Sequence, residues 1–378
     1  MKEDSLWFQN NPLATGLQAI FVFRFQNSRG ATVCYDGWIF SSIGIHFMAS
    51  RYPKSKIRIG VSSCLLGEKV RWDGGHKRDR TLIVQLGRLF EWVPTCPEVE
   101  IGMGIPRESV QLTGNLKSPR MVGTDTETDW TARMHRYSKK RSIELAAMGV
   151  CGYLFKSRSP SCGIAGIPVR SQNGTIANRG RGLLADLFMQ KNPLVPVEDE
   201  ERLQDAPVRE NFITRVFAYH RLTVLLSGRL SHRKLLEFHT TYQFLLLSHS
   251  RKHYDALEKM LLGAGPIQLK HFCLTVPLTS PARVLKSPAA VRRLMRRYAE
   301  TFMQALTYQP TVRKNADALK HMLRFFGKPL TEAERKRVVE GIEGYCNGST
   351  TLTKVVTLIK RYARKYKIDT LAGQTLFS

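Results

Sequence analysis

Strand-like and helix-like segments alternate between residues 56 and 205, and this alternation restricts the fold more than any other feature of the sequence. Apolar, strand-like runs occupy Ile57–Ser62, Phe90–Thr95 and Gly152–Lys156. Helical patterns between them occupy Asp79–Leu89 and Ala132–Met148. Strands that alternate with helices predict a parallel, doubly wound sheet of the Rossmann-like α/β class. Ligands of such sheets bind at the carboxyl ends of the strands.

The pattern becomes helical from Asn211 onward, with apolar residues at spacings of three and four. Thr331 and Glu334 form the sequence signature of a capping box, and Gly327 and Pro329 interrupt the helical pattern before it. A stretch with three prolines and clustered acids, residues 192–212, is typical of a linker. We therefore predict an α/β domain over residues 51–205, followed by an all-α domain over residues 206–378.

Residues 1–50 contain strand-like fragments but no sustained pattern. Met48 precedes a short polar stretch and the first strong strand, so the chain has a second plausible start there. We treat residues 1–50 as an N-terminal extension, with residues 1–47 being either a genuine extension or an artefact of the gene start. A chain that begins at Met48 is expected to fold, because no motif precedes Ile57.

Three cysteines occupy matching positions relative to the predicted strands. Cys64, Cys96 and Cys162 follow the first, second and third strand, and each has glycine or proline close by. In one parallel sheet they emerge at the same edge, which is the geometry of a metal or iron–sulfur site. The other cysteines lack this context and are interpreted as ordinary residues: Cys34, Cys151, Cys273 and Cys346.

The cysteine spacing favours an iron–sulfur cluster over a structural zinc site. Structural zinc sites usually use close Cys-x-x-Cys pairs, and the sequence has none. Three thiolates suit a 4Fe–4S cluster with one iron left open, which can act as a Lewis acid on a soft sulfur atom. A zinc site completed by His76 or by water remains the alternative.

Polar residues of catalytic type accompany the cysteines. Glu98 lies two residues after Cys96, and Ser161 directly precedes Cys162, so both are predicted as catalytic. Asp73, Gly74 and Gly75 follow Cys64 on a loop and are predicted to bind substrate, since glycines allow a ligand to approach the backbone closely. The neighbouring His76 and Asp79 are better explained as solvated loop residues.

The charge is strongly positive and unevenly distributed. The chain carries a formal net charge of +27, and residues 206–378 contain 30 Lys and Arg against 11 Asp and Glu. A basic half indicates either a nucleic-acid partner or a merely solvated basic surface. No apolar run reaches 18 residues and the first 25 residues make a poor signal peptide, so we expect no membrane span and a cytoplasmic protein.

Several multi-residue motifs resemble a bacterial family that includes thiouracil desulfidases of the TudS type. They occur in the family's order and cover about residues 56–205: VSSCLLGEKVRWDGGHKRD, CPEVEIGMGIPRE, KSRSPSCG, GRGLLADLF and PVEDEERLQD. The C-terminal half resembles, more loosely, the YbgA-type helical domain that is often fused to it. Where YbgA members usually read FH-x-x-H-K, this chain has Phe238-His-Thr-Thr-Tyr-Gln243.

The resemblance implies a 4Fe–4S cluster held by Cys64, Cys96 and Cys162, and non-redox removal of sulfur from a thiolated pyrimidine base or nucleotide. The open iron would bind the thiocarbonyl sulfur and hydroxide would attack the carbon, with Glu98 and Ser161 at the family's acid–base and assisting positions. We therefore expect a desulfidase that releases hydrosulfide. The alternative is a nucleic-acid-binding or regulatory protein whose cluster is structural or sensing.

Overall fold

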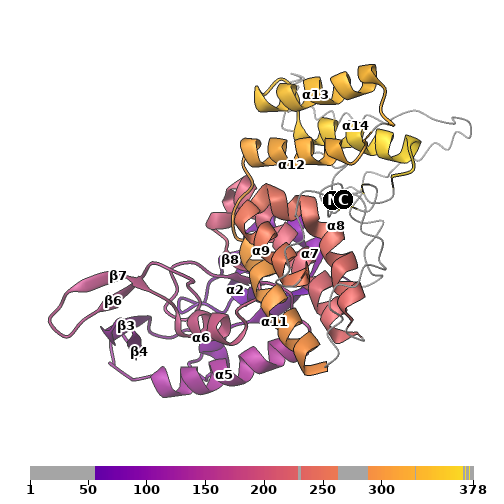
Figure 1. Ribbon diagram of the computed structural model, residues 1–378. Coiled ribbons are helices and arrows are strands. Elements are labelled where there is room, and N and C mark those ends of the chain that lie inside the picture. Colours follow the sequence, from indigo (N-terminus) through magenta and orange to yellow (C-terminus); the bar gives the residue numbers. More distant parts are fainter. Residues whose placement is uncertain are drawn as a thin grey trace, which may run out of the picture. The chain divides into compact units, whose positions relative to one another are not determined.

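The computed structural model describes residues 56–228, 231–262, 288–327, 329–368, 371 and 374 (Figure 1). The predicted N-terminal extension lies outside these residues, as do Cys34 and Cys273. An α/β region precedes a helical region, as the sequence predicts. Among the described residues, no helix is both long enough and apolar enough to cross a membrane.

The first sheet is parallel and has the order β2-β1-β5-β8. Its strands are β1 (Ile57–Ser62), β2 (Phe90–Thr95), β5 (Tyr153–Phe155) and β8 (Val197–Asp199). Five of the six β1 residues are buried, as expected for a parallel strand covered on both faces. The three predicted strands are confirmed, and all of them run in the same direction.

A second sheet, which the sequence analysis did not predict, has the order β4-β3-β6-β7. It pairs two antiparallel hairpins through a parallel contact between β3 and β6, and both hairpins can be followed in Figure 1. Its strands are β3 (Val110–Asn115), β4 (Ser118–Gly123), β6 (Ile167–Arg170) and β7 (Ile176–Gly180). These strands are short, contain glycine, proline and charged residues, and lack a sustained apolar pattern, so the sequence gives only a weak strand signal.

The predicted helices of the α/β region appear as α3 (Arg80–Gly87) and α5 (Thr131–Ala147), and α6 (Leu183–Lys191) is added to them. Helices α5 and α6 pack against β5, where Leu145, Leu184 and Phe188 join Tyr153 and Phe155 in one buried cluster. The rings of Tyr153 and Phe155 stack with centroids 3.8 Å apart. This cluster fixes β5, the strand that leads to Cys162.

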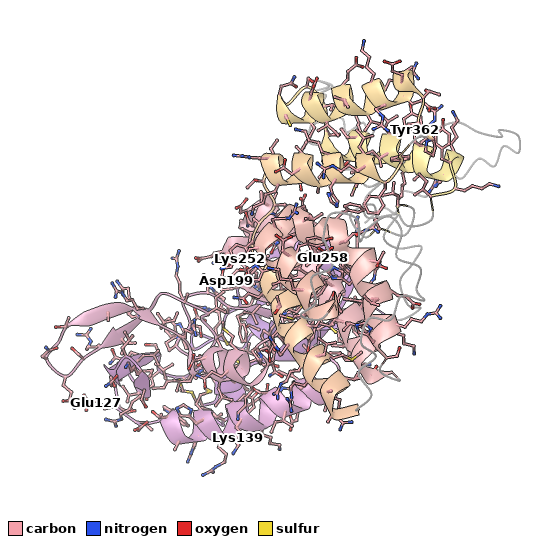
Figure 2. All side chains as sticks on the ribbon, viewed as in Figure 1. Glu127, Lys139, Asp199, Lys252, Glu258 and Tyr362 are labelled. Carbon is pink, nitrogen blue, oxygen red and sulfur yellow. The ribbon has the colours of Figure 1, made fainter. Side chains whose placement is uncertain are left out.

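The C-terminal half is helical, as predicted. The helices among its described residues are α7 (Ala206–Ser227), α8 (His232–His249), α9 (Arg251–Leu262), α11 (Pro288–Ala305), α12 (Val312–Arg324), α13 (Glu332–Cys346) and α14 (Leu352–Lys365). The predicted capping box is present at the start of α13, where Thr331 and Glu334 bond reciprocally. Figure 2 labels Glu258 on α9 and Tyr362 on α14, both buried in this region.

Part of the segment interpreted as a linker belongs to the fold, which corrects that interpretation. Residues 197–199 form β8, the edge strand of the parallel sheet, and Asp199 is labelled in Figure 2. Glu198, Asp199 and Glu200 are buried, with the Glu198 carboxylate 2.8 Å from the Arg202 guanidinium. The clustered acids are typical of a linker in the sequence, but in the structure each has a partner: the Arg202 guanidinium for Glu198, the Arg202 backbone N–H for Asp199, and Lys156 with Ser157 for Glu200.

Candidate active site

The three predicted thiols are brought to one cavity by the strands that precede them. Cys64 lies on the single-turn helix α2 (Ser63–Leu66) after β1, and Cys96 is the N-cap of α4 (Pro97–Glu100) after β2. Cys162 follows β5 after a six-residue loop. All three line a cavity of about 1000 Å³ at the carboxyl edge of the parallel sheet.

Burial controls the charge state of these thiols in the metal-free protein. It raises the pKa of Cys64 to about 11, with a further contribution from Cys96, and it raises the pKa of Cys96 against the opposing effect of the Val99 backbone N–H. It also raises the pKa of Cys162, which is buried most deeply. At neutral pH the free thiols are therefore protonated, and a metal that binds them must displace protons.

The loop that carries Cys162 is fixed by hydrogen bonds at both ends. The Ser159 hydroxyl oxygen accepts bonds from the backbone N–H groups of Ser161 and Cys162, at 3.3 and 3.1 Å. On the other side, the first amides of α6 donate to the loop: Leu183 N to Pro160 O and Leu184 N to Ser161 O. The motif SPSCG is thus a rigid turn that presents the thiol.

Gly182 allows α6 to lie close to this turn. We predict that Gly182→Ala displaces the turn and with it the Cys162 thiol. An alanine Cβ would lie 2.5 Å from the Ser161 carbonyl carbon and 2.6 Å from the Cys162 nitrogen. Overpacking of this kind costs about 1–3 kcal/mol. We expect a lower melting temperature and lower iron retention. Gly341→Ala is the control, since its Cβ would meet Val355 at an ordinary 3.7 Å, and equal effects of the two substitutions would contradict the prediction.

Glu98 is held beside the thiols by two partners. The Arg107 guanidinium donates to Glu98 Oε2 at 2.5 Å, and the Ser161 hydroxyl donates to Glu98 Oε1 at 2.8 Å. The side chain of Arg107 is only 4% exposed, and that of Glu98 is 16% exposed. The two predicted catalytic residues are therefore in direct contact, although 63 positions separate them in the sequence.

A second polar group, Lys156 with Glu200 and Ser157, lies in the same cavity near Cys64. The Lys156 ammonium is 2.5 Å from Glu200 Oε1, and Ser157 donates to Glu200 through its backbone N–H at 2.8 Å and its hydroxyl at 2.7 Å. Burial opposes ionisation of Glu200, but these bonds outweigh it and lower the pKa of the carboxyl. The Lys156 backbone N–H also donates to Ser62 Oγ, which ties β5 to β1.

The predicted substrate-binding residues Asp73, Gly74 and Gly75 form a turn beside the cavity but do not line it. The Asp73 carboxylate accepts a bond from the Gly75 backbone N–H and is paired with Arg71. His76 does line the cavity, but it is exposed and its Nδ1 accepts a bond from the Arg78 backbone N–H. A direct substrate contact of Asp73, Gly74 or Gly75 stays a prediction.

Arg107, Lys156 and Glu200 belong to the site but were not singled out from the sequence. Lys156 carries a usable signal, because it ends a predicted strand at the same edge as the cysteines. Glu200 follows β8, a strand hidden within the supposed linker. Arg107 lies on a loop and has no positional signal beyond its place in the GIPRES motif.

The three thiols are donors of a kind that both iron and zinc accept. In the described part of the chain, no group of three or more His, Cys, Asp or Glu side chains is arranged to hold one metal ion. A zinc ion needs its thiolates about 2.3 Å from one centre, whereas each thiolate of a 4Fe–4S cluster binds a different iron. Three free thiols line one cavity and interact electrostatically, which is compatible with a cluster bound through three thiolates.

The fold and site define a class: an α/β domain with cysteines at the ends of parallel strands, followed by a helical domain. Residues 59–200 match the model of the 2-thiouracil desulfurase family, and residues 282–378 match DUF1722, a family described as proteins of unknown function. Residues 59–200 therefore form a 2-thiouracil desulfurase domain, and residues 282–378 form a DUF1722, or YbgA-like, domain.

Individual relatives match one part of the chain each. The uncharacterized protein YbgA of Escherichia coli K12 is 22% identical over 168 residues, which cover 44% of this chain and 87% of that protein. The uncharacterized protein YbbK of Bacillus subtilis 168 is 29% identical over 148 residues, which cover 37% of this chain and 95% of that protein. A solved [4Fe-4S]-dependent thiouracil desulfidase, TudS, is 30% identical over 39% of this chain and 94% of its own, with a TM-score of 0.33.

Proposed function

We propose that this chain is a desulfidase that removes sulfur from a thiolated pyrimidine base or nucleotide. The observation that carries the proposal is the cavity lined by three strand-end thiols and by Glu98, whose carboxylate accepts a hydrogen bond from the buried Ser161 hydroxyl. The match of residues 59–200 to the 2-thiouracil desulfurase family supports it. The reaction converts a thiocarbonyl and water into a carbonyl and hydrogen sulfide, so no oxidant or reductant is consumed.

Cys64, Cys96 and Cys162 would hold the cofactor, a 4Fe–4S cluster. When bound through three thiolates, such a cluster supplies an open iron that acts as a Lewis acid toward a soft sulfur atom. The protein supplies the rest of the chemistry. Because the thiols are protonated when free, binding of the cluster would release protons to solvent.

Glu98 and Ser161 would manage the protons of the reaction. A thiolated pyrimidine that binds as its thiolate anion has no proton on the ring nitrogen beside the reacting carbon. Water loses one proton, destined for that nitrogen, as it attacks the carbon, and the remaining hydroxyl proton leaves with the sulfur as hydrosulfide when the carbonyl forms. The Glu98 carboxylate accepts the first proton and returns it to the ring nitrogen. The Ser161 hydroxyl is buried and does not line the cavity; it donates a hydrogen bond to Glu98 Oε1 and so orients the carboxylate. Arg107 keeps the carboxylate in place.

Hydrosulfide release tests this function. The full chain, purified anaerobically with measured iron and acid-labile sulfide, is mixed with 2-thiouracil or with 4-thiouridine monophosphate. We expect catalytic release of hydrosulfide together with the oxo-pyrimidine. Iron-loaded protein that releases none from either substrate would leave the regulatory alternative.

We propose nucleic-acid binding by the helical half as a second candidate function, on the ground of its charge. Arg292, Arg293, Arg296 and Arg297 on α11 are all exposed, and residues 206–378 carry a net charge of +19. If they contact phosphates, the logarithm of the affinity falls linearly with log salt, with a slope of about −0.7 to −0.9 per contact. Titration of the full chain with RNA measures the slope. No binding at ~50 mM salt, a permissive condition for counterion release, leaves only a solvated surface.

A further inference from the structure

The cavity has an aromatic side chain at its margin for which the proposed chemistry gives no role. Trp72 lines the cavity, and 47% of its surface is exposed. Covering this ring would stabilise a complex, by roughly 25 cal/mol for each Å² of apolar surface removed from water. A planar ligand that enters the cavity would cover this ring.

The turn that presents Trp72 is closed by its own hydrogen bonds. Arg71 O accepts from Gly74 N at 3.0 Å, Arg71 N donates to Gly75 O at 3.2 Å, and Gly75 N donates to Asp73 Oδ1 at 2.9 Å. Gly74 has a φ of 72°, a left-handed conformation that glycine adopts without strain. Asp73, Gly74 and Gly75 thus shape the turn whose tip is Trp72.

Arg107 ties this turn to the catalytic carboxylate. Its backbone N–H donates to Trp72 O at 3.0 Å, and its guanidinium donates to Val70 O at 2.9 Å. The same guanidinium holds Glu98 at 2.5 Å. Arg107 therefore bonds to the backbone of the Trp72 turn and to the Glu98 carboxylate, which fixes the turn that carries the indole relative to Glu98.

The remaining margin of the cavity suits a flat heteroaromatic ring. Val70, Val110, Leu112 and Ile167 contribute apolar lining, and the polar lining includes Glu98 and Lys156. A ring that stacks on an indole gains affinity through its π face, which every pyrimidine has, and polar atoms at its edge remain free to bond. Stacking therefore recognises the ring without depending on the position of the sulfur.

We propose that Trp72 is the base-stacking residue of this site and selects planar pyrimidine rings. The inference rests on the proposed desulfidase function and adds the ring-recognition residue to it. The turn from Arg71 to Gly75 presents the indole, and Arg107 holds it in register with Glu98. The ring packs against Trp72, and its reacting carbon faces the thiol side of the cavity.

The test separates stacking from apolar contact and from folding. Full-length protein carrying Trp72→Phe, Trp72→Leu or Trp130→Phe is titrated with uracil, and affinity is followed by indole fluorescence and by equilibrium dialysis. Trp130→Phe is the control, because Trp130 does not line the cavity and its buried Nε1 has no hydrogen-bond partner to lose among the described residues. The KM and kcat for 2-thiouracil are measured on the iron-loaded variants.

We expect Trp72→Leu to weaken uracil binding by about 5- to 150-fold and to raise KM in proportion, with a smaller change in kcat. Trp72→Phe should retain most of the affinity, and Trp130→Phe should bind as the unaltered protein does. Unaltered uracil affinity in Trp72→Leu would overturn the proposal, as would equal losses in the Phe and Leu variants. Uracil binding is measured without turnover. An inactive wild-type protein would therefore refute the proposed desulfidase function, while the uracil affinities would still test the role of Trp72.

Discussion

Cys96→Ser is expected to abolish both cluster binding and hydrosulfide release. Cys64→Ser and Cys162→Ser should do the same, because each removes one of three thiols that share the cavity. A serine hydroxyl stays protonated where a thiol can ionise, so the serine does not replace the lost thiolate ligand. The two remaining thiolates are not expected to retain a cluster that the proposed site binds through three thiolates. The measurement is iron and acid-labile sulfide per chain, together with hydrosulfide release.

Cys346→Ser is the matched control, since Cys346 is an exposed free thiol at the end of α13, on the helical half. It should keep full iron content and activity. A Cys96→Ser protein with both intact would remove Cys96 from the ligand set. One zinc per chain without iron in the unaltered protein would favour the zinc alternative.

Cluster loading should also depend on pH in a defined direction. Burial raises the pKa of Cys64 to about 11, so protons compete with the metal at neutral pH. Apparent affinity should therefore rise as pH increases toward that value and fall as pH decreases, because only the thiolate binds metal. Iron uptake by metal-free protein at several pH values measures this, and affinity that falls with rising pH would contradict it.

The thiol set was predictable because strand ends carry strong positional information. An apolar run identifies a strand, parallel pairing aligns the carboxyl ends, and a cysteine just beyond each end must then reach the same edge. The register confirms this reasoning: β1 pairs in parallel with β2 and with β5. Cys96 and Cys162 meet in the cavity without any sequence motif that links them.

The second sheet and the polar partners were not predictable in the same way. Strand β3 has one buried residue in six, so it shows no apolar run that a periodicity argument could detect. Glu200 reads as solvated in the sequence because its partners, Lys156 and Ser157, lie more than 40 positions away. Arg107 likewise acquires its role only when the loop returns to Glu98. Such long-range polar contacts depend on tertiary structure.

Glu98→Gln should slow turnover by about 10²–10⁴-fold while the cluster remains bound, which is the usual contribution of general acid–base catalysis. The substitution is nearly isosteric. The amide oxygen can still accept from Arg107, and the amide nitrogen can donate to the Ser161 oxygen, so both partners of the carboxylate are kept. What the variant loses is the ability to take a proton from water and return it to the ring nitrogen.

Matched variants isolate this effect. Glu91→Gln alters an exposed carboxylate on β2, the strand that leads to Cys96; Glu91 is paired with Arg58 outside the cavity, so the substitution should leave turnover unchanged. Ser161→Ala should cost less than Glu98→Gln, because the hydroxyl orients Glu98 but is itself a weak base.

The measurement is hydrosulfide release per bound iron in all three variants, with uracil affinity determined in parallel. Uracil affinity should change little in Glu98→Gln, since the proton transfers belong to the transition state and not to ring binding. Turnover near that of the unaltered protein, with iron intact, would exclude the acid–base role. Loss of iron would instead make Glu98 a structural support for Cys96. The two residues are linked through Arg107, whose guanidinium donates both to Glu98 and to Val70 O, and Val70 O also accepts from the Cys96 thiol.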